Sequence, residues 1–258
     1  MPEKSLTIFF PCYNDSGTIA SLVISAYDVA KSLTNDYEVI VIDDGSEDNS
    51  REILDSLKLI YNDLKLIYHP KNKGYGDVLR SGFNSATKNY IFYTDGDGQY
   101  DVYELKRLYR CLNKDVDVVN GYKIFRNDPL HRILIGKTYL FLTRLIFNYK
   151  SRDVDCDFRL IKRSTIKEIN LKQKSGVVCL ELIKKLENIN AVFIEIPVNH
   201  YFRTHGKSQF FNFKRTSEII YNIFVLYFNL LNEPRFNKVK KTNNKNPSLL
   251  NKLPDYKK

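Results

Sequence analysis

The sequence has few cysteines, and none of them are paired at a spacing that would close a disulfide or metal site. The four thiols are Cys12, Cys111, Cys156 and Cys179, far apart along the chain. Small extracellular folds depend on dense cysteine pairs, and structural zinc sites need them close together. We therefore exclude a disulfide framework and a cysteine-rich zinc site, and we expect free thiols in a reducing cytoplasm.

A long hydrophobic run is also missing. The most apolar segment, residues 219–231, is thirteen residues long and is interrupted by Asn222 and Asn229. A helix needs about 20 apolar residues to cross a bilayer. The first residues lead directly into an apolar strand pattern, without the features of a secretion signal. We expect no membrane span, and residues 219–231 form either a buried core helix or a helix at a membrane interface.

Charge is abundant but unevenly placed. The 258 residues carry a net charge of +10 and are 43% hydrophobic, which is enough to bury a large core. Residues 233–258 hold eight Lys or Arg against two acidic residues, so this segment alone contributes +6. Its polar composition predicts disorder. We expect one domain over 1–215, an apolar helix over 216–232 and a basic tail over 233–258, which either is simply solvated or binds anionic lipid headgroups.

Strands and helices alternate along the chain. Apolar, β-branched runs predict strands, and the segments between them predict helices. The expected strands are 5–11, 37–42, 64–68, 90–94, 116–119 and 191–197, and the expected helices are 18–33, 49–61, 74–87, 131–148 and 176–188. This order is typical of an α/β fold with a mostly parallel sheet, whose ligands bind at the carboxyl ends of the strands. The first strand lacks the Gly-x-Gly-x-x-Gly sequence of a dinucleotide-binding dehydrogenase, which disfavours that class.

Three polar clusters follow the ends of expected strands, at 13–15, 43–46 and 95–99. In the last cluster Asp95 and Asp97 stand one residue apart and Gln99 follows. Two carboxylates this close need a counter-charge in a dry site, and oxygen ligands suit Mg²⁺ or Mn²⁺. Because such a cation usually binds phosphate oxygens as well, the cluster predicts a metal-bound diphosphate or triphosphate. An ordinary turn rich in Asp and Gly would have the same composition.

Six short segments occur in an order that is typical of one enzyme family. They are residues 11–15, 42–46, 72–76, 95–99, 153–159 and 200–208. Over about residues 5–211 the chain resembles the family 2 glycosyltransferases of the GT-A fold, and within them the dolichol-phosphate mannose synthase-like branch. The resemblance implies a Rossmann-like nucleotide-diphospho-sugar transferase fold, in which helices flank a mostly parallel central sheet.

The resemblance also implies a nucleotide site at the first two clusters. The residues around the base would be Pro11, Tyr13 and Asp15, with Ile42 and Asp44 at base and ribose. Relatives usually have glutamate at the position of Asp15. The loop 72–76, with Gly74 before an expected helix, would belong to the donor site, because glycine allows close backbone approach and helix N-termini favour anions. An ordinary loop is the alternative.

The third cluster resembles the metal motif of the family. Asp95, Gly96 and Asp97 would meet the cation and the donor, and Gln99 would be a further ligand. Three basic residues would contact the donor phosphates, namely Lys123, Arg203 and Lys207. Relatives commonly have arginine at the position of Lys123 and lysine at the position of Gln209, which Lys207 would replace. Solvated surface side chains are the alternative reading of Lys123 and Arg203.

The segment 153–159 would lie on the acceptor side. Relatives have glycine where this chain has Asp157, and aspartate tolerates a left-handed backbone better than most residues. Arg159 would bind an acceptor phosphate through two parallel hydrogen bonds. Alternatively, it pairs with Asp153 or Asp155.

The resemblance implies inverting transfer of a hexose from a GDP-mannose or UDP-glucose type of donor to a polyprenyl (dolichyl or undecaprenyl) phosphate. Such an acceptor is already an anion, so no strong base is needed, which agrees with the lack of an obvious His–Asp base pair in the sequence. A sugar hydroxyl would need a carboxylate base, for which Asp155 and Glu181 are the candidates. The expected catalytic residues are Asp97, Asp155, Arg159 and Glu181.

The apolar helix 131–148 would lie along the lipid chain of the acceptor. Four basic residues are candidates to meet the lipid phosphate, namely Arg126, Arg132, Lys137 and Arg144. We expect a peripheral protein on the cytoplasmic face of an anionic membrane, held by 219–231 and the tail or by a membrane-protein partner, without a nucleic-acid partner. Two alternatives stay open: a soluble transferase acting on a sugar hydroxyl in surface-polysaccharide synthesis, and a non-catalytic protein that binds nucleotide sugars.

Overall fold

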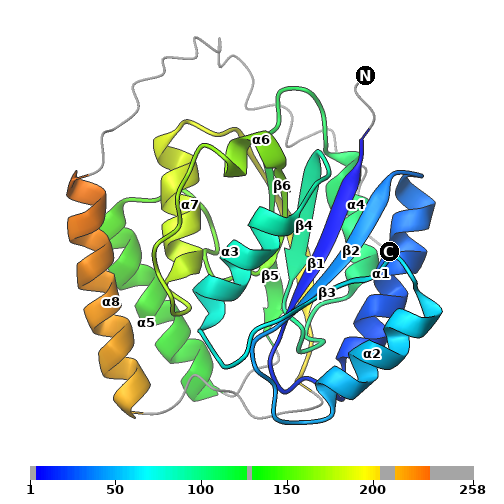
Figure 1. Ribbon diagram of the computed structural model, residues 1–258. Coiled ribbons are helices and arrows are strands. Elements are labelled where there is room, and N and C mark those ends of the chain that lie inside the picture. The colour runs from blue at the N-terminus through cyan, green and yellow to red at the C-terminus, as the bar shows by residue number, and fades with distance from the viewer. Residues whose placement is uncertain (1–3, 127–129, 204–212, 233–258) are drawn as a thin grey trace.

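A seven-stranded sheet forms the centre of the molecule. The computed structural model describes residues 4–126, 130–203 and 213–232, and the predicted basic tail at 233–258 lies outside them. The strand order is β3-β2-β1-β4-β6-β5-β7 (Figure 1). The strands are β1 (Leu6–Cys12), β2 (Tyr37–Asp43), β3 (Lys65–Tyr68), β4 (Tyr90–Thr94), β5 (Val118–Arg126), β6 (Phe158–Lys162) and β7 (Phe193–His200). Helices flank this sheet, so the expected α/β class is confirmed.

The strands β1 to β4 form a parallel half-sheet. β1 pairs with β2 and β4, and β2 pairs with β3, all in parallel. Residues of β1, β2 and β4 are almost all buried, which suits strands that are covered on both faces. The register aligns Cys12 with Asp43. The loops that follow β1, β2 and β4 therefore meet at one edge of the sheet, where the three polar clusters lie.

Among the strands that the structure describes, only β6 runs against the others. It is antiparallel to β4 and β5, whereas β5 and β7 are parallel. The strand β6 was not expected from the sequence, because the charged Arg159 interrupts its apolar pattern. Arg159 is fully buried in this strand. The sheet is mostly parallel, as predicted.

Helices cover both faces of the sheet. They are α1 (Ile19–Leu33), α2 (Ser50–Ile60), α3 (Tyr75–Ser85), the 3-10 turn η1 (Val102–Glu104), α4 (Leu105–Arg110), α5 (Leu130–Phe147), α6 (Arg163–Ile166), α7 (Val178–Asn188) and α8 (Phe213–Asn232). One core lies between the sheet and α1, α2 and α4. A second core lies between the sheet and α3, α6 and α7. All four thiols are free, and three of them are buried.

Helices α5 and α8 form an outer pair beside α7 (Figure 1). A third cluster of buried side chains joins them to α7 and includes Phe147, Leu180 and Leu226. Burial of one leucine side chain contributes about 2 kcal/mol, so this small core stabilises the packing of α8 against α5 and α7. α8 begins at Phe213, before the expected start at residue 216. The apolar pattern does not reveal this start, because the first turns of the helix are polar in sequence. None of the described helices is long and apolar enough to cross a membrane.

Candidate active site

The end of β1 and the turn after β4 pack against each other. Oδ2 of Asp15 accepts a hydrogen bond from the backbone N–H of Tyr13 at 3.1 Å. A Cβ atom at Gly96 would lie 2.3 Å from the carbonyl oxygen of Pro11 and 3.0 Å from Oδ2 of Asp15. Only glycine fits such a close approach. The structure thus brings these four predicted residues together, while their contacts with a ligand stay predictions.

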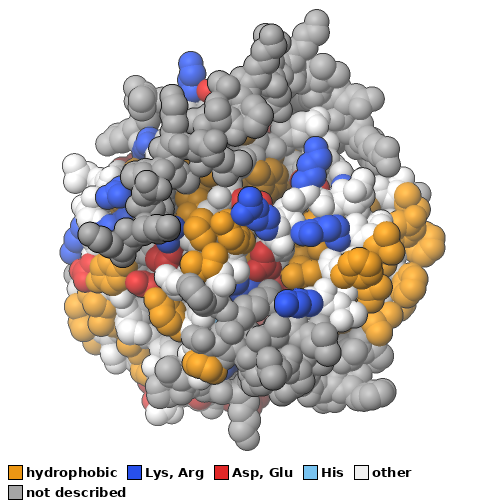
Figure 2. All heavy atoms as spheres, turned by 180° about the vertical axis from the view of Figure 1, so that it is seen from behind, with side chains coloured by type: hydrophobic (Ala, Val, Ile, Leu, Met, Phe, Trp, Pro, Cys, Tyr) orange, Lys and Arg blue, Asp and Glu red, His pale blue; other side chains and the backbone are white. Residues whose placement is uncertain are grey.

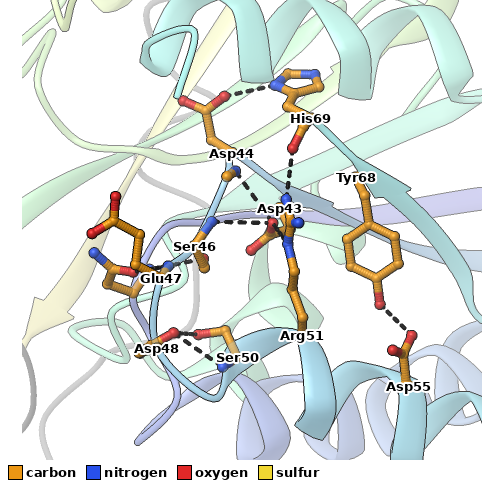
Figure 3. A network of polar contacts seen from close by, with 12 residues as sticks. Asp43, Asp44, Ser46, Glu47, Asp48, Ser50, Arg51, Asp55, Tyr68 and His69 are labelled. Atoms are coloured by element: carbon orange, nitrogen blue, oxygen red, sulfur yellow. Dashed lines mark hydrogen bonds and ion pairs between the residues drawn. The ribbon is translucent and has the colours of Figure 1, made fainter. Parts of the chain in front are cut away.

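Two adjacent carboxylates at the end of β2 have different surroundings (Figure 3). Oδ1 of Asp43 accepts hydrogen bonds from the N–H groups of Gly45 and Ser46, both at 3.2 Å, and pairs with Nε of Arg51 at 2.6 Å. Oδ2 of Asp43 is buried without a hydrogen-bond partner. An unpaired buried acceptor is costly, and because Asp43 is fully buried, this oxygen belongs to the interior of the protein and not to a surface that a ligand can reach. The resemblance to the family implies a ligand role for Asp44 and not for Asp43, and the local sequence does not predict how their surroundings differ.

Asp44 is engaged with the loop that follows β3. Its Oδ1 accepts a hydrogen bond from the N–H of Lys73 at 3.0 Å, and its Oδ2 accepts one from Gly74 at 2.9 Å. Oδ1 also lies 2.6 Å from Nδ1 of His69. The residue is only 3% exposed. Asp44 therefore holds the loop 72–76, and a ribose hydroxyl would have to compete with these bonds.

The loop 72–76 is tightly packed against the loop before α7. Gly74 has a φ of 98°, and a Cβ atom there would lie 2.7 Å from the carbonyl oxygen of Lys174. The N–H of Gly76 donates to the same carbonyl at 2.8 Å. A Cβ atom at Gly76 would lie 1.9 Å from the carbonyl oxygen of Gln173, so neither glycine could carry a side chain here. The nearby Ile42 is fully buried in the core beneath α3.

Asp95 and Asp97 follow β4 and contact different elements. The hydroxyl of Tyr75 donates to Oδ1 of Asp95 at 2.5 Å. Oδ1 of Asp97 accepts a hydrogen bond from the N–H of Gln99 at 3.1 Å, and Oδ2 forms an ion pair with Arg203. The turn therefore connects the loop after β3 with the chain after β7, and it brings Arg203 to Asp97, while contact of Arg203 with donor phosphates stays a prediction.

Gln99 fixes this turn against the end of β7. Its carbonyl accepts a hydrogen bond from the N–H of Tyr201 at 2.8 Å, and its Nε2 donates to the carbonyl of Tyr201 at 2.9 Å. Gly98 has a φ of 72°, a conformation that glycine adopts without strain. The amide nitrogen of Gln99 is thus engaged, and its amide oxygen is the atom that suits a cation.

Negative charge accumulates where these loops meet. Burial, with the charge of Asp97 adding to it, raises the pKa of Asp15 to about 6. Burial, followed by Asp157 and Asp97, raises the pKa of Asp95 well above its usual range. A divalent cation would relieve this repulsion, and the oxygen donors suit Mg²⁺ or Mn²⁺. The residues therefore fit such a cation.

The protein would supply only part of the coordination shell. In the part of the chain that the structure describes, no three His, Cys, Asp or Glu side chains are arranged to hold a metal ion by themselves. Mg²⁺ commonly binds one or two carboxylates and completes its shell with water and phosphate. The geometry thus suits a cation that arrives with a phosphate ligand.

Comparison with known proteins identifies the family. Residues 7–169 match the family described as Glycosyl transferase family 2. The chain belongs to this family. Similar solved structures include glucosyl-3-phosphoglycerate synthase from Mycobacterium tuberculosis with Mn²⁺, UDP and glucosyl-3-phosphoglycerate, which is 13% identical over 90% of this chain and 81% of that chain, with a TM-score of 0.64. The same synthase with Mg²⁺ and UDP is 12% identical over 90% and 80%, with a TM-score of 0.65.

Family membership makes this protein a glycosyltransferase of the nucleotide-sugar type. At such low identity the solved structures show the shared fold, and they confirm the GT-A fold that the sequence predicts. The match to the family ends at residue 169, before α7, β7 and α8. The family match therefore gives no information on α7, β7 and α8, whose roles have to be inferred from their own contacts.

Arg159 of this glycosyltransferase is fully buried. Its Nε donates to Oδ1 of Asn120 at 2.8 Å, and its Nη2 donates to the carbonyl of Val154 at 2.5 Å. Its Nη1 donates to Oδ1 of Asp157 at 2.7 Å and also contacts the hydroxyl of Tyr93. All three nitrogens are engaged within the protein, so in this structure Arg159 organises the floor of the site.

Asp157, at the position where relatives have glycine, is the residue that pairs with Arg159. Its backbone does not have a positive φ, so this loop does not need glycine. The pairing of Thr94 with Phe158 across β4 and β6 places Asp157 opposite Asp95. The departure from the family pattern thus adds a carboxylate beside Asp95, and Arg159, which the family pattern also contains, balances its charge.

Asp153 and Asp155, which the sequence suggested as partners of Arg159, lie next to Lys123 instead. Nζ of Lys123 lies 3.6 Å from Oδ2 of Asp153 and donates to the backbone carbonyl of Asp155 at 2.6 Å. Burial raises the pKa of Asp155 to about 6, although Lys123 opposes the shift. Asp155 thus keeps the chemistry of a candidate base, and Lys123, on β5, contacts the loop that carries Asp153 and Asp155.

Glu181, the other candidate base, is 1% exposed. Its carboxylate accepts hydrogen bonds from the N–H groups of Lys172 at 2.9 Å and Gln173 at 2.8 Å, and it lies 3.0 Å from Nζ of Lys185. A general base needs an oxygen that reaches a substrate proton. These contacts favour a structural role for Glu181, in which it anchors the loop that packs on Gly74.

The remaining basic candidates are spread over the molecule. Arg144 donates to the carbonyl of Ser151 at 2.7 Å, and Lys137 is exposed on α5. Outside the described parts of the chain lie Lys207 and the side chains of Arg126 and Arg132. Among these described basic candidates, Arg203 is the one that contacts the carboxylates after β4, through its ion pair with Asp97.

Proposed function

We propose that the protein transfers a hexose, with inversion, from a GDP-mannose or UDP-glucose type of donor to a polyprenyl phosphate, as in the dolichol-phosphate mannose synthase-like branch. The observation that carries the proposal is an apolar surface on α5 and α8. Its ten large side chains are each at least 36% exposed: Phe141, Leu142, Leu145, Ile146, Ile220, Tyr221, Phe224, Tyr227, Phe228 and Leu231. We name this surface the α5–α8 face.

The α5–α8 face is the outer side of a helix pair whose inner side is packed. On α8, Leu226 is fully buried, whereas Phe224 and Phe228 are both 59% exposed. Figure 2 shows hydrophobic side chains gathered along the right-hand edge, on the side where α8 lies. A contiguous apolar surface commonly marks contact with a protein, a ligand or a membrane. A glycosyltransferase with a lipid acceptor would use such a surface to contact the lipid or the membrane that contains it.

Charge next to this face favours a membrane as its partner. α8 ends at Asn232, and the segment 233–258 that follows it has a net charge of +6. Each Lys or Arg near an anionic membrane contributes about 1 kcal/mol to binding. The protein would lie peripherally on the cytoplasmic face, with the α5–α8 face among the lipid headgroups. A membrane protein that covers the same face is the other outcome to test.

Asp95, Asp97 and Gln99 would hold Mg²⁺ or Mn²⁺ together with the donor diphosphate. Support comes from the buried negative charge at this point, and from the M. tuberculosis synthase, which is solved with UDP and either cation. The bound cation would neutralise charge on the leaving nucleoside diphosphate. Arg203, which pairs with Asp97, places a second positive charge at the same phosphates.

One observation supports a second candidate, a soluble acceptor. The similar structures belong to a synthase of glucosyl-3-phosphoglycerate. An acceptor hydroxyl needs a base, and the buried Asp155, with a pKa raised to about 6, is suited to that role near neutral pH. A polyprenyl phosphate would not need Asp155 as a base, because its phosphate is already deprotonated.

A transfer assay separates the two candidates. Purified protein with Mn²⁺ is incubated with radiolabelled UDP-glucose or GDP-mannose, and with either undecaprenyl phosphate in detergent or a soluble acceptor such as 3-phosphoglycerate. We expect the label to move into the organic phase in the lipid reaction. Label in a soluble product only would replace the proposal with the soluble acceptor.

A further inference from the structure

His69 follows β3 and is connected through each of its polar groups (Figure 3). Its backbone N–H donates to the carbonyl of Asp43 at 2.8 Å, and its own carbonyl accepts a hydrogen bond from Nη2 of Arg51 at 2.6 Å. Nδ1 lies 2.6 Å from Oδ1 of Asp44, and Nε2 lies 3.0 Å from Oγ of Ser81. The residue is 4% exposed. The imidazole is thus a buried connection between the end of β2 and helix α3.

Asp44 extends this connection to the loop 72–76. One carboxylate oxygen is shared between His69 and the N–H of Lys73, and the other accepts the N–H of Gly74. A single orientation of the carboxylate satisfies all three contacts. If His69 did not hold one oxygen, the side chain of Asp44 could rotate, and the loop would lose the acceptors of two of its N–H groups.

The loop then reaches the metal motif. Tyr75, which follows Gly74, donates its hydroxyl to Oδ1 of Asp95 at 2.5 Å. Gly74 has little room to move, because a Cβ atom there would lie 2.7 Å from a backbone carbonyl of the neighbouring loop. An unbroken series of contacts therefore runs from His69 through Asp44 and the loop to Asp95.

We propose that His69 is a positioning residue for the donor site: through Asp44 it holds the loop 72–76 so that the hydroxyl of Tyr75 orients Asp95. The inference rests on the proposed role of Asp95 as a ligand of the donor-bound cation. Groups that hydrogen-bond a metal-binding carboxylate set its orientation, and their loss commonly lowers metal affinity about 10- to 100-fold.

The order of Ser81, His69 and Asp44 also matches the contacts of an activated serine nucleophile. Two observations argue against that chemistry. His69 is 4% exposed, so a substrate cannot reach the space between the imidazole and the hydroxyl. The carboxylate of Asp44 is shared with two backbone N–H groups of the loop. These contacts favour a positioning role for the group.

A pair of amide substitutions separates the two sides of the imidazole. The side-chain nitrogen of asparagine is as many bonds from Cβ as Nδ1 of histidine, whereas that of glutamine matches Nε2. His69→Asn therefore keeps the donor to Asp44 and loses Ser81, and His69→Gln does the reverse. Ser81→Ala is the matched control, because it removes only the outer contact.

Titration calorimetry with UDP and GDP in the presence of Mn²⁺ measures the effect. For His69→Gln we expect the dissociation constant of the better nucleotide to rise about tenfold or more. For His69→Asn and Ser81→Ala we expect a change below about threefold, because the contact with Asp44 persists. Amide hydrogen exchange at Lys73 and Gly74 should speed up in His69→Gln alone.

Equal losses in both His69 variants, or normal affinity in His69→Gln, would overturn the positioning role. If His69→Gln does not fold, Tyr75→Phe tests the far end of the same connection, and normal binding by that variant would also overturn it. If the wild-type protein binds neither nucleotide with Mn²⁺, the metal assignment fails. Faster amide exchange at Lys73 and Gly74 in His69→Gln would then show that His69 holds the loop 72–76 without a role in metal binding. That outcome is distinguishable from failure of the positioning role.

Discussion

The region from β1 to β4 and the region from β5 to α8 differ in how their buried charges are compensated. In the first region Asp15 and Asp95 lie near each other at the sheet edge, and burial raises the pKa of both. In the second region Arg159 pairs with Asp157 and Lys123 pairs with Asp153, so the chain supplies its own cations. The carboxylates of the first region would therefore be stabilised by a ligand that brings positive charge, whereas in the second region burial raises the pKa of Asp155 to about 6, and Asp157 and Asp153 have internal partners.

The two regions also differ in their outer surfaces. The helices α1 and α3 of the first region bury most of their apolar residues against the sheet, and the exposed apolar residues of its helices α1 to α3 are Ile24, Leu59 and Ile60. In the second region α5 and α8 bury one side against α7 and leave the ten residues of the α5–α8 face exposed. The second region thus presents a larger exposed apolar surface than the first.

The largest effect should come from removing the internal cation of the second region. Arg159→Leu would leave Asp157 buried without its partner, and loss of one member of a buried ion pair costs about 3–5 kcal/mol. We expect the free energy of unfolding in urea to fall by that amount. Arg159→Leu combined with Asp157→Asn should recover much of it. Wild-type stability of the single variant would contradict the comparison.

Removing a carboxylate from the first region should damage binding more than stability. Asp97→Ala is expected to abolish Mn²⁺-dependent binding of UDP or GDP and to slow transfer at least about 100-fold, as expected for a lost electrostatic contact. Calorimetry with and without Mn²⁺ measures the binding. Asp77→Ala, which breaks a half-buried ion pair with Arg80 on α3, is the matched control. Equal nucleotide binding with and without metal would remove the metal assignment.

The α5–α8 face should respond to polar substitution. Replacing Phe224 and Phe228, both 59% exposed, with aspartate should reduce binding to anionic vesicles at least about tenfold, because apolar burial is lost. Removal of 233–258 should abolish only the salt-sensitive part of binding. Vesicle sedimentation at low and high salt measures both effects.

Leu59→Asp is the control for this surface, since Leu59 is 83% exposed on α2, in the other region. We expect it to bind vesicles like the wild type. If the protein that retains residues 233–258 does not bind anionic vesicles even at low salt, the α5–α8 face either contacts a protein partner or has no partner.

Substitution of the adjacent carboxylates after β2 should separate their roles. Asp44→Ala is expected to weaken donor binding by about 1–3 kcal/mol through loss of charged hydrogen bonds. It should also speed amide exchange at Lys73 and Gly74, which Asp44 holds. Asp43→Asn should leave this exchange unchanged, because the side chain of Asp43 contacts Gly45, Ser46 and Arg51 and not the loop 72–76. Identical exchange in both variants would show that the two carboxylates act as one unit.

The smallest effect is expected at Asp155. With a polyprenyl phosphate, Asp155→Asn should change the transfer rate by less than about threefold, whereas loss of a general base costs about 10²–10⁴-fold. A base must be deprotonated, so a reaction that depended on Asp155 would slow as the pH falls through its pKa of about 6. Rates of both variants measured from pH 5 to pH 8 would reveal such a dependence.

Much of the first region was predictable from the sequence. The strands β1, β2 and β4 are apolar runs between turns, and the parallel order follows from their alternation with helices. Because the carboxyl ends of parallel strands meet at one edge, the proximity of Asp15 to Gly96 could be expected. The second region was harder to predict: β6 was missed, because a buried arginine does not look like a strand residue.

Local sequence decided which segments become strands and helices, and it placed carboxylates at the strand ends, because propensity and apolar period act over a few residues. Tertiary structure alone decided which carboxylate received which partner. Asp43 and Asp44 are chemical equals in the sequence, yet one has an unpaired buried oxygen and the other holds a loop. Likewise, the pairing of β4 with β6 brought Asp157 opposite Asp95. Burial and partner geometry depend on residues far apart in the chain, so they are fixed only when the sheet assembles.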